Sequence, residues 1–531
     1  MSVGWPSPPG VPDSGPKETD PLTEPEPPAE SAGAPDQLAF ATGRGRWVIA
    51  ATVLGSGMAS IDATVVGIAL PTIGRAFHSG VATLQWVVSG YSLTLAAFLL
   101  LGGSLGDRMG RKRIFTVGIV WFTVASMCCG FAPNAGTLIA ARILQGVGGA
   151  LLAPASLAIL QASFRPDDRS RAIGAWSGLG GVATAAGPLL GGYLIVAASW
   201  RWVFFINLPV AVVVLLVTRR HVPETRDPST AGHVDFLGAG LAVLFLAGLT
   251  YGLIEAPSHG WSSPVVLAGL IAAAVTAPAF LVVEHVRAHP MLPLGLFRTR
   301  QFSGANAVTF VVYGALGGAL FLLPVELQLV VRYSPLESGL ALLPVTGIML
   351  PFSARSGQLA ARIGPRLQMT AGPLVVAAGL LLLTRATHSG SYLVEVLPAV
   401  IVFGAGLALT VAPLTSTAMG AAPAEHAGVA SAVNNVVARA ASLLAVAILP
   451  LVAGITGAAA LHPHHFAGGF RNAMIITGLA CAAGGLLAAA TIRNPQNAPR
   501  ILNRRHPRYS CALDGTPLMF DGAADDATTD S

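Results

Sequence analysis

Two charged side chains lie inside long apolar runs of this 531-residue chain, where an ionisable group is costly. Asp62 stands in IDATVVGIALPTI, and Arg142 stands in ARILQGVGGALLAPA. Burial favours the neutral form of a carboxyl group, so Asp62 could take up or release a proton as its surroundings change. A buried guanidinium needs a partner, and protonation of Asp62 would release Arg142 from such a pair. The alternatives are a packing residue, a residue lining a water-filled vestibule, and an ion pair that never titrates.

The two charges are expected at similar depths. With the helical rise per residue, Asp62 lies about 24 Å from Arg46, and Arg142 lies roughly 12 Å from the outer end of its own helix. Asp62 is then the nearest acid to Arg142 within the apolar layer. Gln145 and Gly149 share the helix face of Arg142 by their i+3 and i+7 spacing, so Gln145 is a candidate hydrogen-bonding residue of a central cavity.

Four further residues could contact a substrate. Trp86 and Tyr91 are possible aromatic contacts, although interfacial anchoring explains Trp86 as well. Glu326 lies near the outer end of its run, where we favour a water-exposed position at the cavity mouth over a role as ligand. Arg439 interrupts another apolar run and either faces the cavity or holds a structural partner.

A dense charge cluster, GSLGDRMGRKR, occupies residues 103–113 between two apolar runs. Asp107 can pair with a nearby arginine or cap a helix N-terminus. Contacts made in one conformation and broken in another would latch this end of the molecule, and the alternative is that the charges only set topology. The candidate latch residues are Gly103, Asp107, Arg108, Gly110, Arg111 and Lys112.

The charge cluster has a second copy later in the chain. Its Gly103, Arg108 and Gly110 have counterparts with identical spacing at Gly357, Arg362 and Gly364. Ala361 replaces the acid in this copy, and Pro365 replaces Arg111, so the full charge chemistry belongs to the first copy. A repeated helix-end device of this kind indicates a duplicated membrane architecture, which is typical of transporters.

Composition places these residues in a membrane protein. Hydrophobic residues make up 53% of the chain and charged residues 11%, against about 25% charged in a soluble domain. The net charge of +6 is spread over short loops and the C-terminal region, which argues against a nucleic-acid partner. His462, His464 and His465 read as loop histidines rather than a metal site. The absence of a GxxxxGK[ST] pattern leaves ATP-driven pumping unsupported.

Apolar runs of spanning length predict fourteen helices. They fall near 47–73, 83–103, 114–132, 135–161, 171–197, 203–218, 235–255, 264–286, 303–331, 339–361, 368–386, 394–418, 428–455 and 470–491. Basic residues concentrate in the turns after even-numbered runs, so these turns and both termini are expected in the cytoplasm.

The repeat aligns the first six runs with the last six and leaves two in the middle. We therefore expect an all-α polytopic membrane protein of two six-helix bundles with an inserted helix pair. The predicted parts are a disordered cytoplasmic tail (1–45), an N-terminal bundle (46–220), a linker with inserted helices 7 and 8 (221–287), a C-terminal bundle (288–492) and a cytoplasmic tail (493–531).

The motifs together resemble the major facilitator superfamily, specifically its fourteen-helix drug:proton antiporters of the EmrB/QacA type. The resemblance covers about residues 46–492 and rests on GSLGDRMGRKR, IDATVVGIALPTI, the RxxQGxGxA pattern at Arg142, and GLGGVATAAGPLLGG. The last segment is similar to the packing motif that marks antiporters, here at Gly187, Pro188, Gly191 and Gly192.

This resemblance implies alternating access in the inner membrane, with multidrug or antibiotic efflux driven by the proton gradient and no cofactor. We expect a monomer whose partners are a small molecule, protons and lipid, with Asp62 and Arg142 as the coupling residues. Export of an endogenous metabolite uses the same parts and stays open, as do proton-coupled uptake and a non-transporting membrane sensor. An enzyme is not expected, because the chain lacks a clustered nucleophile, base or metal set.

Overall fold

The computed structural model describes residues 37–226, 235–287, 290–386, 391–422, 427–457 and 460–494. Most of the two predicted tails, 1–36 and 495–531, lies outside this range. Within it the protein is helical, with one isolated bridge between Leu38 and Phe164 and no strand. Fourteen helices of the described chain are long and apolar enough to cross a membrane, as predicted.

The first seven helical elements form six spans, because α6 and α7 together make one. They are α1 (Gly43–Ala76), α2 (Val81–Met109), α3 (Arg111–Gly130), α4 (Ala135–Ser163), α5 (Pro166–Ala197), α6 (Trp202–Phe205) and α7 (Asn207–His221). The inserted pair is α8 (Phe236–His259) and α9 (Pro264–Val286).

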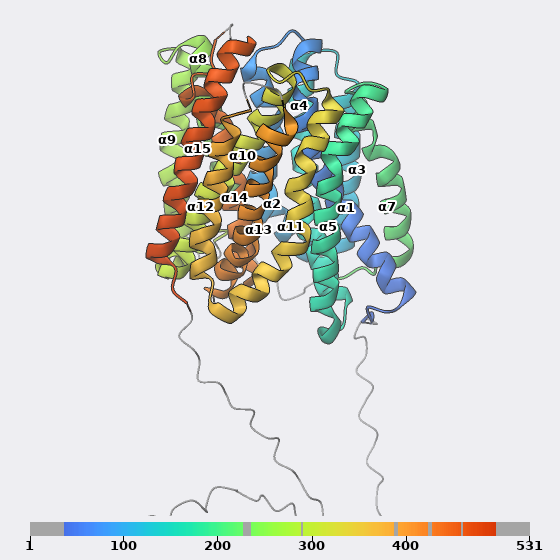
Figure 1. Ribbon diagram of the computed structural model, residues 1–531. Coiled ribbons are helices and arrows are strands. Elements are labelled where there is room, and N and C mark those ends of the chain that lie inside the picture. The colour runs from blue at the N-terminus through green and yellow to red at the C-terminus, as the bar shows by residue number, and fades with distance from the viewer. Residues whose placement is uncertain are drawn as a thin grey trace, which may run out of the picture. The chain divides into compact units, whose positions relative to one another are not determined.

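The last six spans follow a short 3-10 helix, Leu294–Arg298. They are α10 (Arg300–Leu329), α11 (Pro335–Ile363), α12 (Arg366–Leu383), α13 (Leu397–Gly420) with a π turn (Tyr392–Val396) before it, α14 (Ala427–Val452) and α15 (Pro463–Thr491). The start of α1 and the end of α15 lie on the same side (Figure 1).

Two boundaries differ from the prediction. The first helix begins at Gly43, where the Thr42 side chain accepts a hydrogen bond from the Gly45 amide, and Leu38 is already buried against Phe164. Residues 38–45 are therefore ordered rather than part of a disordered tail. The charge cluster is also mostly helical, since α2 runs to Met109 and α3 starts at Arg111. Hydropathy falls where a helix leaves the apolar layer, but its backbone hydrogen bonds continue.

Packing follows the predicted repeat. Within the first half, α4 packs on α2 and α3, and α5 packs on α1; within the second, α13 packs on α11 and α12, and α14 packs on α10. The halves meet along α5 with α11 and along α2 with α14. The inserted helices pack mainly on each other, and α8 reaches both α2 and α14. The fold is thus two six-helix bundles with an inserted pair.

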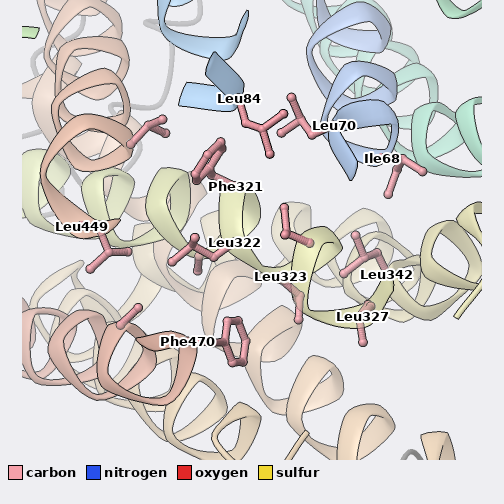
Figure 2. Close-up of a cluster of buried hydrophobic side chains, with 14 of the residues drawn as sticks. Ile68, Leu70, Leu84, Phe321, Leu322, Leu323, Leu327, Leu342, Leu449 and Phe470 are labelled. Carbon is pink, nitrogen blue, oxygen red and sulfur yellow. The ribbon is translucent and has the colours of Figure 1, made fainter. Parts of the chain in front are cut away.

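A large apolar cluster joins the two halves at the ends of α1, α2 and α10 that lie away from the basic turns. It contains Leu70, Leu84, Phe321 and Leu449, which converge in Figure 2. We call this end of the molecule the outer end, following the predicted orientation. Buried apolar area of this extent stabilises the contact between the halves, so it favours closure at the outer end.

Candidate functional site

The structure brings Asp62 on α1 and Arg142 on α4 into direct contact. Arg142 Nη1 donates to Asp62 Oδ2, and each residue is 1% exposed. Gln145 Nε2 donates to Asp62 Oδ1 at 2.8 Å, while Arg142 Nη1 also lies 2.7 Å from Gln145 Oε1. The depth estimate and the shared helix face therefore placed these three residues correctly. Their role in coupling stays a prediction.

Two more groups complete the surroundings of this ion pair. Asn207 at the start of α7 donates through Nδ2 to Asp62 Oδ1 at 3.4 Å, and to Ser126 Oγ on α3 at 2.9 Å. The Arg142 guanidinium lies 4.3 Å from the ring centroid of Tyr91 and donates through Nε to the Val87 carbonyl at 3.1 Å. The sequence analysis missed Asn207, although a lone amide at the head of an apolar run could have indicated it.

A cavity of about 610 Å³ lies beside the ion pair, bounded by α1, α2, α4, α5 and α14. Tyr91 lines it, which agrees with the prediction, and Tyr91 also separates the cavity from Arg142. Hydroxyl groups of Ser60, Thr64 and Ser431 alternate along its wall with leucine and alanine side chains. Such a mixed wall suits an amphipathic small molecule.

The outer end of the cavity is closed by contacts between the halves. Gln85 Nε2 on α2 donates to the Val446 carbonyl on α14 at 2.7 Å, and Gln328 Nε2 on α10 donates to the Ile68 carbonyl on α1 at 2.9 Å. A side chain at Gly339 on α11 would collide with the Pro188 carbonyl on α5. The backbones of the two halves therefore touch at this end.

The predicted antiporter motif supplies the α5 surface of this closure. Gly187 and Gly191 face Thr64 and Val65 of α1, whereas Gly192 faces the start of α11. Small residues let these helix backbones approach closely. The contribution of these glycines in this arrangement is close helix packing.

The cavity extends to the end of the molecule that carries the basic turns. Its lining there includes Gly103, Asp107 and Gln161. With the predicted orientation, the structure is therefore open towards the cytoplasm and closed towards the outside.

Two predicted cavity residues lie elsewhere. Trp86 Nε1 donates to Glu255 Oε1 on α8 at 2.7 Å, so its indole faces the inserted pair and the prediction of a cavity contact is wrong. Gln145 is fully buried in the ion-pair network and does not line the cavity. Periodicity defines a helix face but does not say which neighbouring helix covers it.

Glu326 also differs from its prediction. It is completely buried near the outer end of α10 rather than exposed at a mouth, and neither of its carboxylate oxygens has a hydrogen-bond partner among the described residues. The last helical turns of α10 are covered on all sides by other helices, which hydropathy alone did not indicate.

In the candidate latch, Asp107 pairs with a nearby arginine, which is one of the two arrangements predicted for it. Asp107 pairs with Arg111 at 2.8 Å, one helical turn away, while Arg108 is exposed. Gly110 takes a φ of +107°, which a residue with a side chain rarely adopts, and it allows α3 to start directly after α2.

In each copy of this cluster, a side chain that was not predicted accepts a hydrogen bond from a backbone amide at the start of the following helix. Glu224, three residues after α7, accepts a hydrogen bond from the Lys112 amide at 3.2 Å. Asn494, three residues after α15, accepts one from the Arg366 amide at 3.1 Å. Lys112 and Arg366 occupy equivalent positions in the two copies. The spacing of the repeat does not align Glu224 with Asn494, so the repeat itself carried no signal for these two acceptors.

Comparison with known proteins agrees with this architecture. The sequence profile of the Major Facilitator Superfamily matches residues 52–446. The multidrug resistance protein Stp of Mycobacterium tuberculosis is 37% identical over 415 residues, which cover 78% of this chain and 77% of Stp. The tetracenomycin C resistance and export protein of Streptomyces glaucescens is 36% identical over 410 residues, or 76% of each chain. The methylenomycin A resistance protein of Streptomyces coelicolor is 35% identical, covering 84% of this chain and 92% of that one.

Solved structures show the same fold at low sequence identity. A bacterial homologue of the human lysosomal transporter Spinster superposes with a TM-score of 0.63 at 16% identity, covering 85% of this chain and 98% of its own. A POT family transporter in complex with 5-aminolevulinic acid gives 0.64 at 12% identity, with 86% and 97% covered. With its fourteen spans, its paired six-helix bundles and its profile match, this chain belongs to the Major Facilitator Superfamily.

Proposed function

We propose that this protein exports hydrophobic or amphipathic small molecules, such as drugs or antibiotics, across the cell membrane in exchange for protons. Three relatives of similar length carry names that refer to drug or antibiotic resistance, and one of these names includes export. The single structural observation that carries the coupling step is the buried Asp62–Arg142 pair beside the cavity. Both chain termini lie in the cytoplasm in this proposal, because the basic turns do.

Asp62 is the proton carrier in this mechanism. When it is ionised, it accepts hydrogen bonds from Arg142, Gln145 and Asn207, which hold α1, α4 and α7 together. Protonation removes the charge that attracts Arg142, while the guanidinium keeps the Val87 carbonyl and the Tyr91 ring as partners. The ion pair can therefore open without leaving Arg142 isolated.

Substrate enters from the cytoplasm in the conformation seen here. Export requires the contacts at the outer end to break and the inner end to close, so the cavity becomes accessible from the outside. Proton binding at Asp62 from the outer side and proton release to the inside would couple that cycle to the gradient, since the two protonation states favour different helix contacts. A proton gradient is the only energy source the proposal uses.

Proteoliposomes with a pH-sensitive dye test the proposal directly. Addition of a transported compound to the intact protein is expected to move protons, whereas Asp62→Asn, which cannot titrate, is expected to abolish proton movement and gradient-driven export. Glu255→Gln on the inserted pair is the matched control and is expected to behave as the parent. Proton movement by Asp62→Asn equal to the parent would disprove the assignment of the carrier, and a panel of compounds without any transport would favour the sensor alternative.

A further inference from the structure

We propose that Arg439 makes this cavity selective for amphipathic organic anions, with the guanidinium binding a carboxylate or a similar planar oxyanion. This inference rests on the proposed export function and names the class of substrate. Arg439 lies on α14, in the second half of the chain, and its side chain lines the cavity opposite the helices that carry the Asp62–Arg142 pair.

The charge balance of the cavity wall is the first observation. Asp107 and Arg439 are its two residues with charged side chains. Asp107 at the inner end is neutralised by Arg111 at 2.8 Å. Arg439 has no ion pair, and its Nε is buried without a hydrogen-bond partner among the described residues. The ionisable groups that interact electrostatically with Arg439 are the phenols of Tyr91 and Tyr313, with no carboxylate of the described chain among them. The cavity therefore carries one uncompensated positive charge.

An unpaired guanidinium in a membrane-embedded cavity needs compensation, because removing it from bulk water is costly. The described chain supplies no anionic partner, so an anionic ligand bound in the cavity would provide that compensation. The planar guanidinium offers five N–H donors in a fork that matches a carboxylate with two parallel hydrogen bonds. A cationic substrate would instead meet repulsion at this position.

Two polar residues near Arg439 add hydrogen-bonding groups to the cavity wall. Ser431 and Asn435 precede it by two turns and one turn on the same face of α14, and both line the cavity. Asn434, the residue before Asn435, donates to Asn306 and Thr309 on α10, and these contacts fix the rotation of the helix. The orientation that exposes Arg439 to the cavity is thus set by a separate buried contact.

The helices of the first half provide the apolar surface that an amphipathic ligand needs. Leu95, Leu99 and Leu100 of α2 and Leu157 of α4 line the cavity towards its inner end. An anionic head at Arg439 leaves an apolar body free to lie along these side chains. Substrate recognition would then use Arg439 of the second half together with apolar side chains of the first, while proton coupling uses the first half.

The test compares three probes with one pyrene body and different heads: pyrenebutyrate (anionic), pyrenebutanol (neutral) and pyrenebutylamine (cationic). Binding to the purified full-length protein is measured by fluorescence, with Arg439→Gln, Arg439→Lys and the exposed outer-turn variant Arg385→Gln as control. Arg439→Gln is expected to weaken pyrenebutyrate binding about tenfold or more, with little change for the alcohol and equal or tighter binding of the amine. Arg439→Lys is expected to be intermediate, because it keeps the charge and loses the fork.

Three results would overturn the inference: no pyrenebutyrate binding by the parent protein, an equal loss for all three probes in Arg439→Gln, or no loss for the anion. The binding assay does not depend on transport. If the anion binds through Arg439 but no probe is exported from proteoliposomes, the export proposal fails and the anion site stands. If neutral and cationic compounds are exported with proton movement while the anion does not bind, the anion site fails alone.

Discussion

The carboxylate of Asp62 is the point where several helices of the first half meet. Asp62 and Arg142 differ in the contacts that each would keep if the other were removed. Besides Asp62, Arg142 contacts the Val87 carbonyl, Gln145 Oε1 and the Tyr91 ring, whereas Asp62 would keep the amides of Gln145 and Asn207. The free-energy cost of removing one member of the pair therefore differs between Asp62 and Arg142, although their opposite charges are equal in magnitude.

This asymmetry predicts different stabilities for the two single variants. Arg142→Ala leaves a buried carboxylate without a cation and a large cavity, and we expect it to lower the free energy of unfolding by about 3–5 kcal/mol. Asp62→Asn keeps the amide and ring contacts and is expected to lose markedly less. Thermal unfolding in detergent, followed by size exclusion, measures both. Equal stability of Arg142→Ala and the parent would contradict the arrangement of partners described here.

Replacement of Glu326, in contrast, is expected to stabilise the protein. Among the described residues the two oxygens of Glu326 have no hydrogen-bond partner, and they lie on a helix segment where Leu322, Leu323 and Leu327 are buried. An unsatisfied polar group in such surroundings costs free energy. Glu326→Leu is expected to raise the melting temperature by several degrees, and Glu326→Gln is expected to fall between it and the parent. A lower melting temperature of Glu326→Leu in the same detergent assay would mean that the carboxyl group makes a stabilising contact.

At the scale of elements, the two halves hold their equivalent helix ends with different chemistry. The Lys112 amide meets the carboxylate of Glu224, and the Arg366 amide meets the neutral side chain of Asn494. A charged acceptor forms the stronger hydrogen bond. The first half therefore has the tighter connection between its last span and the α2–α3 junction, which also contains the Asp107–Arg111 pair.

Hydrogen–deuterium exchange can resolve this connection half by half. Glu224→Ala is expected to speed exchange in peptides covering residues 107–116 and to leave those covering 362–370 unchanged, because it removes one acceptor only. Glu224→Gln retains an acceptor oxygen and is expected to be milder. Asn494→Ala serves as the reciprocal control, with faster exchange at 362–370 alone. Faster exchange at both junctions in either variant would show that the effect is global destabilisation.

At the scale of the whole molecule, the contacts between halves are concentrated where α5 meets α11 and where α2 meets α14. Apolar packing, the Gln85 and Gln328 hydrogen bonds and the close approach at Gly339 all lie at the outer end. The cavity opens at the other end, beside Asp107. Export requires these outer contacts to be broken once in every cycle.

A cross-link at the outer end is therefore expected to stop transport reversibly. Gln85→Cys and Val446→Cys, in a background with the four native cysteines replaced by alanine, can be joined by a short disulfide-containing bifunctional maleimide. Export in proteoliposomes is expected to fall to the background of empty liposomes after cross-linking and to recover after cleavage of the linker by reductant. Each single-cysteine variant treated with the same reagent is the control. Undiminished export by the cross-linked protein would mean that this end does not open.

The sequence alone determined the membrane class, the fourteen spans, the repeat and the depth of the two buried charges. Each of these depends on local composition or on the fixed rise of a helix, so Asp62, Arg142 and Gln145 could be placed together in advance. The tertiary structure decided which helix covers each side chain. It turned Trp86 towards the inserted pair, buried Glu326 and brought Glu224 to the charge cluster. It also placed Arg439 on the cavity wall without an ion-pair partner in the described part of the chain. Those outcomes depend on contacts between distant segments, and helical periodicity carries no information about which segments meet.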